Sequence, residues 1–163
     1  MLNREPRLAT LRDRQAVEDI VRTAYSGYVA RIGREPGPML DDYGALIEER
    51  RVTVLEHDGV VQAILVLIPQ ADGLLLDNVA VAPAAQGLGS GRRLLQFAEE
   101  VAVASGFRTI SLYTNEAMTE NIALYARLGY VETHRAEEKG FRRVYMAKQL
   151  PCTAAPRTTR AGT

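Results

Sequence analysis

Three glycines at alternate positions mark the segment 86–91, Gln-Gly-Leu-Gly-Ser-Gly, which separates a strand-like run from a helical pattern. The apolar run spans Leu74 to Val81, and the helical pattern continues to about Ser105. Glycines at such a junction let a ligand approach bare backbone N–H groups at a helix N-terminus. Unpaired amides and the helix dipole favour negative charge there. The segment therefore predicts a strand–loop–helix unit that binds a phosphate or pyrophosphate.

Two common nucleotide motifs do not fit this loop. A P-loop needs a lysine followed by serine or threonine after its last glycine, and Gly91 is followed by Arg92 and Arg93. The dinucleotide fingerprint needs G-x-G-x-x-G within a βαβ unit. Here the spacing is G-x-G-x-G, and the Asp58-Gly59 turn before it favours an antiparallel hairpin. Both nucleotide-binding interpretations are therefore disfavoured.

Hydrophobic periodicity and turn residues predict eleven elements in the order β-α-α-β-β-β-α-β-α-β-β. Asp13 is expected to cap the first helix. Strands are predicted at about 8–11, 52–56, 60–68, 74–81, 109–114, 130–135 and 142–150, and helices at about 14–32, 41–50, 89–105 and 119–128.

Length and charge narrow the class of protein. The 163 residues suit one domain, and the formal net charge of zero provides no field that favours nucleic acid or a membrane surface. No apolar stretch approaches a membrane span, and no Cys/His cluster has metal-ligand spacing. We expect a cytoplasmic, metal-free domain over residues 1–150. The Thr/Ala/Arg/Pro-rich segment 151–163 is expected to be a disordered tail.

Two motifs in the correct order resemble the GNAT superfamily of acetyl-CoA-dependent N-acetyltransferases. The segment 79–91 resembles the family's (Gln/Arg)-x-x-Gly-x-(Gly/Ala) signature after a strand that ends in a Val-x-Pro-like step. The segment 121–130, Asn-Ile-Ala-Leu-Tyr-Ala-Arg-Leu-Gly-Tyr, is similar to the family's second hallmark, Asn-x-x-x-Tyr-x-x-x-Gly-(Phe/Tyr). The resemblance implies an α+β fold, with a mixed, mostly antiparallel sheet of about six or seven strands flanked by helices. A splayed strand pair would form a wedge for acetyl-CoA.

The same resemblance implies a cofactor site for acetyl-CoA as co-substrate. Loop amides would bind its pyrophosphate, backbone groups of the preceding strand would pair with its pantetheine arm, and the amide near Val79 or Ala80 would face the thioester carbonyl. The expected cofactor-binding residues are Val79, Ala80, Val81, Gln86, Gly87, Leu88, Gly89, Ser90, Gly91, Arg92, Asn121 and Tyr125.

Catalytic residues follow from the second motif and from the strand before the loop. Asn121 and Tyr125 lie four residues apart and share one helix face. By resemblance, Tyr125 would be the general acid that protonates or hydrogen-bonds the leaving thiolate. Asp77 is the candidate base, acting through water, or it orients the acceptor ammonium; a structural or solvated aspartate remains an alternative. Regular alternation would place Asp77, Val79 and Val81 on one face, and a bulge would break that phase.

The acceptor is expected to be a primary amine of a small molecule or peptide, which attacks the acetyl group directly in a ternary complex. Tyr25, Tyr28, Glu35 and Asn78 are its candidate contacts. The alternative function is a GNAT-like module that binds or senses acyl-CoA without transferring it. A homodimer is also compatible with the family resemblance.

Overall fold

The structure, a computed structural model, describes residues 5–151. The predicted tail comprises residues 151–163, and all of these except Pro151 lie outside the described range. The strands are β1 (Arg7–Leu8), β2 (Val52–His57), β3 (Val60–Gln70), β4 (Gly73–Val81), β5 (Thr109–Asn115), β6 (Val131–Glu138) and β7 (Phe141–Gln149). The α-helices are α1 (Arg14–Tyr25), α2 (Val29–Ile32), α3 (Tyr43–Glu48), α4 (Ser90–Ala104) and α5 (Thr119–Arg127). Short 3-10 turns lie at η1 (Leu11–Asp13), η2 (Ser26–Tyr28), η3 (Gly37–Leu40) and η4 (Pro83–Ala85).

The strands form one seven-stranded sheet in the order β1-β2-β3-β4-β5-β7-β6. Every neighbouring pair is antiparallel except β4 and β5, which helix α4 connects as a parallel pair. The predicted fold class, an α+β mixed sheet flanked by helices, is confirmed. The predicted helix over 14–32 is interrupted, because the chain passes through the 3-10 turn η2 between α1 and α2.

Local sequence explains several helix ends. Asp42 caps α3, since its Oδ1 accepts a hydrogen bond from the Ala45 amide at 3.1 Å. Gly106 follows α4 with φ of 81°, and Gly129 follows α5 with φ of 97°. These left-handed conformations suit glycine and let the chain turn back into the next strand.

Helices cover both faces of the sheet. On one face, α4 and α5 pack on a core that includes Leu65, Leu94 and Tyr125. On the other face, α1 and α3 pack on a second core that includes Val17 and Ile64. Burial of these two apolar faces is the main stabilising contribution.

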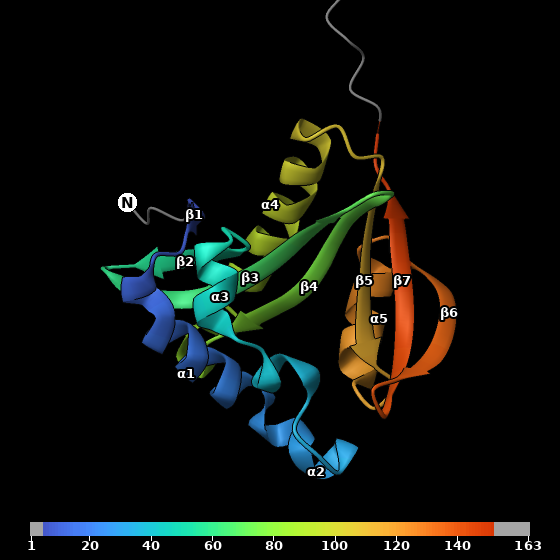
Figure 1. The fold of residues 1–163 in the computed structure, drawn as a ribbon, viewed down its shortest axis with the longest axis horizontal. Helices are drawn as coiled ribbons and strands as arrows, with labels where there is room; N and C mark the ends of the chain where they lie inside the picture. The colour runs from blue at the N-terminus through green and yellow to red at the C-terminus, as the bar shows by residue number, and fades with distance from the viewer. Residues whose placement is uncertain (1–4, 152–163) are drawn as a thin grey trace, which may run out of the picture.

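The sheet opens between its two parallel strands. β4 pairs with β5 only where Leu74, Leu75 and Leu76 face Ile110, Ser111 and Leu112. Beyond Leu76 the two strands diverge, and Figure 1 shows them as a V with α2 below its open end. The expected splayed pair is therefore present.

A β-bulge lies where the strands separate. Val66 of β3 pairs with Asn78, whereas Leu67 pairs with Leu76, so Asp77 has no partner on β3. Before the bulge, Leu76 packs in the α4-side core, and after it Val79 packs there. The bulge thus breaks the regular alternation that would place Asp77 and Val79 on one face.

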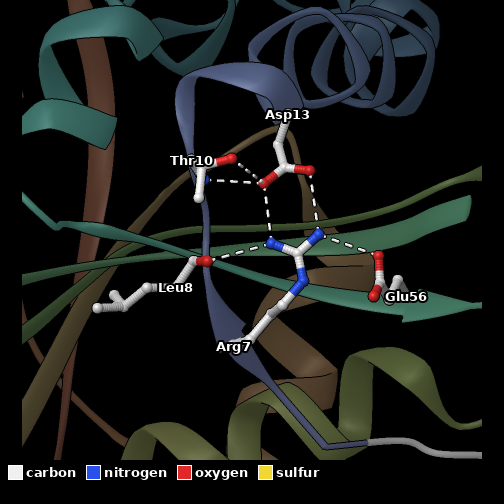
Figure 2. Close-up of polar contacts among 5 residues, drawn as sticks. All are labelled: Arg7, Leu8, Thr10, Asp13 and Glu56. Atoms are coloured by element: carbon white, nitrogen blue, oxygen red, sulfur yellow. Dashed lines mark hydrogen bonds and ion pairs between the residues drawn. The ribbon is translucent and has the colours of Figure 1, made fainter. Parts of the chain in front are cut away.

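The N-terminal strand is tied down by a charged cluster. Arg7 donates hydrogen bonds to Asp13 at 2.9 and 3.1 Å and to Glu56 at 3.0 Å (Figure 2). Asp13 also accepts from the Thr10 amide at 2.8 Å. The prediction that Asp13 caps α1 is therefore wrong: its carboxylate makes no cap bond to α1 and faces backward to Thr10 and Arg7. Its hydrogen bonds with Arg7 lower the pKa of Asp13 below its usual value.

Candidate active site

Two cavities meet inside the wedge between β4 and β5. The first is a groove of about 560 Å³, bounded by β4, the start of α4 and α5. The second is a smaller cavity of about 50 Å³, bounded by β4, β5, β7 and the segment 36–38. Four residues line both: Tyr25, Val79, Asn121 and Tyr125. A chemical group held at this junction can be reached from the groove and from the smaller cavity.

The glycine loop forms one end of the groove. Gly87 and Gly89 have φ of 80° and 85°, a conformation that other residues rarely adopt. A Cβ on Gly91 would lie 3.3 Å from Val81 Cγ2, so glycine allows α4 to start close against β4. The amides of Ser90, Gly91 and Arg92 belong to the first turn of α4, where N–H groups have no acceptor within the helix.

Most expected cofactor residues line this groove. They are Val79, Ala80, Val81, Gln86, Gly91, Arg92, Asn121 and Tyr125. Leu88 and Ser90 instead line a separate hollow beside Leu55 and His57. Gly87 and Gly89 shape the loop backbone and line neither of the two meeting cavities.

The strand edge in the wedge exposes backbone groups. The Ala82 amide donates to Gln62 O of β3 at 2.8 Å, so alternation directs the backbone groups of Val79 and Val81 away from β3. Consistent with this direction, Val79 O accepts from the Tyr25 hydroxyl at 3.2 Å, and Val81 O accepts from Gln86 Nε2 at 3.5 Å. An extended ligand arm can pair with this edge as an added strand does.

Asn121 and Tyr125 present one face of α5 to the junction, as their spacing predicts. Tyr125 is buried, with 7% of its surface exposed, and none of the hydrogen bonds among the described residues uses its hydroxyl. Burial, with a smaller effect of Tyr28, raises the pKa of Tyr125 to about 12. The hydroxyl is thus protonated at neutral pH and available to a ligand at the junction.

The smaller cavity contains an aspartate held by a tyrosine. The Tyr113 hydroxyl donates to Asp77 Oδ1 at 2.7 Å. The Arg143 guanidinium lies over the Tyr113 ring, 4.3 Å from its centroid, and donates from Nη1 to Glu138 at 2.7 Å. The bulge therefore brings Asp77 to a site where β5 and β7 also contribute side chains.

A second hydrogen-bond chain fixes the opposite wall. The Tyr25 hydroxyl donates to buried Asn78 Oδ1, Asn78 Nδ2 donates to the Tyr43 hydroxyl at 3.0 Å, and Tyr43 donates to Pro38 O. Both tyrosine hydroxyls are desolvated, which raises the pKa of Tyr25 and of Tyr43 well above the usual value. The chain joins α1, β4, α3 and the segment that bounds the small cavity.

The expected acceptor contacts divide between the cavities. Asn78 lines the small cavity, Tyr25 lines both, and Tyr28 lines the groove. Glu35 is exposed and lines neither cavity.

The sequence interpretation missed Tyr113 and Arg143 as contributors to the cavity. They come from β5 and β7, strands that become neighbours only in the folded sheet. A weak signal was available, because each is a polar or aromatic residue that alternates with buried neighbours, such as Leu112 and Val144.

Two classes of site have no support within residues 5–151. The described residues contain no group of three or more His, Cys, Asp or Glu side chains placed to hold a metal ion. None of the helices in this range is long and apolar enough to cross a membrane.

Known proteins share both the sequence pattern and this architecture. The model of the acetyltransferase (GNAT) family matches residues 14–130. The ribosomal-protein-S18-alanine N-acetyltransferase from Escherichia coli is 20% identical, covers 94% of this chain and 97% of its own, and superposes with a TM-score of 0.74. YncA from Salmonella typhimurium, classed as an acetyltransferase and solved with its cofactor acetyl-CoA, is 25% identical. The match covers 96% of this chain and 99% of YncA, with a TM-score of 0.69. The PaiA N-acetyltransferase from Thermoplasma acidophilum, solved with coenzyme A, is 16% identical. The match covers 89% of this chain and 98% of PaiA, with a TM-score of 0.72.

The family match covers most of the chain and includes the glycine loop and the Asn121–Tyr125 helix. The structural neighbours reproduce the fold over nearly their full length. The chain therefore belongs to the GNAT family of acetyltransferases and is an acyltransferase enzyme.

Proposed function

We propose that the protein transfers an acetyl group from acetyl-CoA to a primary amine by direct attack in a ternary complex. The single observation that carries this proposal is the junction of the two cavities at Tyr25, Val79, Asn121 and Tyr125. A donor in the groove and an acceptor in the small cavity would meet there without a covalent enzyme intermediate.

The groove fits the donor in two physical respects. Gly91 lines the groove at the first turn of α4 and adds no side chain there, which suits a pyrophosphate against backbone amides. The outward-facing groups of Val79 and Val81 suit the amides of a pantetheine arm. Arg92 lines the same groove and would add positive charge near the phosphates.

Tyr125 is proposed to stabilise the leaving thiolate. The residue is buried and lines the junction, and none of the hydrogen bonds among the described residues uses its hydroxyl, so the group can donate to a ligand that arrives there. A pKa of about 12 makes full proton transfer to an alkyl thiolate uphill, so a hydrogen bond in the transition state is the role that fits best.

Asp77 is proposed to receive the acceptor as an ammonium and to accept its proton, directly or through water. The amine must lose that proton before its nitrogen attacks, because a protonated amine has no free electron pair. The N–C bond then forms as the C–S bond breaks, and the Val79 amide would stabilise negative charge on the carbonyl oxygen. The nitrogen loses its second proton to water, and the thiolate leaves with a hydrogen bond from Tyr125 and takes a proton from solvent as free CoA. Tyr113 orients Asp77 for this role through its 2.7 Å hydrogen bond.

The direct test is a thiol-release assay with acetyl-CoA and a broad amine panel, together with mass analysis of the acceptor. The expected result is equal amounts of free CoA and acetylated amine. Tight CoA binding without thiol release for any amine would instead favour a non-catalytic acyl-CoA-binding role for this chain.

A homodimer is a further proposal. All eight residues of β6 are exposed, and β6 is the outermost strand of the sheet. A second copy could pair with this edge, and light scattering on the purified protein tests whether it does; a monomer at every concentration would exclude it.

A further inference from the structure

The small cavity contains two opposite charges arranged around one tyrosine. Asp77 accepts from the hydroxyl end of Tyr113 at 2.7 Å, and the guanidinium of Arg143 covers the face of the same ring at 4.3 Å. Both charged residues line the cavity. A ligand there meets a carboxylate and a guanidinium about one tyrosine side chain apart.

The size of the cavity restricts what fits between them. Its volume of about 50 Å³ corresponds to roughly four water-sized positions, at about 10–15 Å³ for each. This space matches the ammonium, Cα and carboxylate of an amino acid better than a long chain. The remaining walls combine apolar residues such as Pro36, Pro38 and Phe141 with uncharged polar ones: Asn78, Thr114, Asn115 and Asn121.

The Arg143 guanidinium has more N–H donors than its described contacts use. Its side chain is 12% exposed, and Nη1 donates to Glu138 at 2.7 Å, with the Tyr145 hydroxyl beside the guanidinium. A guanidinium carries five N–H donors, and these contacts do not use them all. Donors this far removed from solvent favour a further acceptor, and a carboxylate is the group that fits the planar guanidinium best.

Other charges near the mouth are mixed. Arg34 lies over the Phe141 ring at 4.0 Å and donates to Lys139 O, so a second guanidinium lies at the ring that Arg143 also approaches. Asp41 interacts electrostatically with Asp77, Lys139 and Arg143. The cavity thus has no uniform sign, as expected for a ligand that carries both charges.

From this arrangement we infer that the acceptor is a free α-amino acid, whose ammonium faces Asp77 and whose carboxylate binds Arg143. The inference rests on the proposed acetyl transfer and names its acceptor class. The N-terminus of a peptide lacks the α-carboxylate and would leave the Arg143 donors facing a neutral carbonyl. A diamine would place a second ammonium against a guanidinium, which is unfavourable.

The test compares the twenty common L-amino acids with their L-amino-acid amides in the thiol-release assay. The amides keep the amine and side chain but lose the carboxylate. We expect a lower KM for at least one free amino acid than for its amide. Arg143→Gln should raise that KM roughly 10- to 100-fold, with a much smaller effect on kcat and on the KM of the amide.

Arg142→Gln is the matched control. Arg142 is the neighbouring residue on β7, is exposed, and pairs with Glu116 at 3.5 Å outside the cavity. It should leave both KM values unchanged. Circular dichroism and CoA titration of both variants separate loss of folding from loss of acceptor binding.

The outcomes distinguish this inference from the proposed function. Turnover of amides, peptides or diamines at least as efficient as that of free amino acids would overturn the inference and leave acetyl transfer intact. Absence of thiol release with every amine would count against acetyl transfer. In that case, calorimetric titration of amino acids into the CoA-loaded protein tests the acceptor site. Saturable binding that Arg143→Gln weakens would support the inference, and the absence of such binding would overturn the inference.

Discussion

The Tyr25 hydroxyl donates a hydrogen bond to Asn78 Oδ1, and this contact joins the end of α1 to the bulged strand β4. Both side chains are buried, and the same hydroxyl lies 3.2 Å from Val79 O. The contact therefore positions the wall shared by the two cavities as well as stabilising the fold.

Tyr25→Phe should lower the free energy of unfolding by about 1–3 kcal/mol, because it leaves Asn78 Oδ1 buried without this donor. Chemical denaturation measures the loss. Tyr28→Phe is the control, since none of the described hydrogen bonds uses its hydroxyl, and it should change stability by less than about 0.5 kcal/mol. Equal stability of the two variants would show that the Tyr25 contact is not formed.

Local sequence patterns predicted part of the lining of the groove, and its role in cofactor binding stays a prediction. The alternate glycines and the four-residue spacing of Asn121 and Tyr125 are local patterns. Of these residues, Gly91, Asn121 and Tyr125 line the groove, whereas Gly87 and Gly89 do not. The acceptor side of the site was harder to predict from the sequence. Tyr113 and Arg143 lie beside Asp77 only because β5 and β7 pair next to the open wedge, and the alternation within each strand does not indicate which strand becomes its neighbour.

Two local predictions differ from the structure, and each difference has an identifiable physical reason. The helical spacing of apolar residues continued through Tyr25 and Tyr28, but the chain forms a 3-10 turn at Ser26–Tyr28, where Gly27 weakens helix propensity. Asp13 had the right position for a cap, but Arg7 provides two hydrogen bonds to its carboxylate and directs it away from α1.

Gly91→Val should weaken CoA binding at least about 10-fold. The added side chain starts 3.3 Å from Val81 Cγ2 and places branched carbons at a position that lines the groove, where the phosphates are proposed to bind. Calorimetric titration with CoA measures the affinity. Ala104→Val, at the exposed far end of the same helix, controls for the lower helix propensity of valine and should bind CoA as the wild type does. Wild-type affinity in Gly91→Val would contradict the assigned phosphate site.

Asp41 should make stability depend on pH. Partial desolvation of its carboxylate and the charge of Asp77 raise the pKa of Asp41 to about 6, although the residue is exposed overall. Because the folded protein holds this proton more tightly than the unfolded chain, the ionised form destabilises the fold as pH rises from about 4 through 6. Solvent screening limits the effect to about 1 kcal/mol or less.

Asp41→Asn should therefore match the wild type near pH 4 and be more stable at pH 7, as followed by thermal unfolding across that range. Glu35→Gln, which removes an exposed carboxylate outside both cavities, is the control for loss of one surface charge. A constant difference between Asp41→Asn and the wild type at every pH would contradict the account of Asp41.

Tyr125 and Tyr130 provide a matched pair for the chemistry. Their rings pack edge to face with centroids 5.9 Å apart. The Tyr130 hydroxyl is buried without a hydrogen-bond partner among the described residues, and none of the hydrogen bonds in this range uses the Tyr125 hydroxyl. Only Tyr125 lines the junction of the two cavities. Replacing either residue with phenylalanine removes one oxygen atom from nearly the same environment.

The most direct measurement of the central claim is kcat for CoA release by the wild type, Tyr125→Phe and Tyr130→Phe, together with the Kd of each for CoA. The account predicts that Tyr125→Phe lowers kcat at least about 10-fold with Kd within about twofold, and that Tyr130→Phe retains wild-type kcat. Wild-type kcat in Tyr125→Phe would contradict acetyl transfer assisted by Tyr125 at this junction.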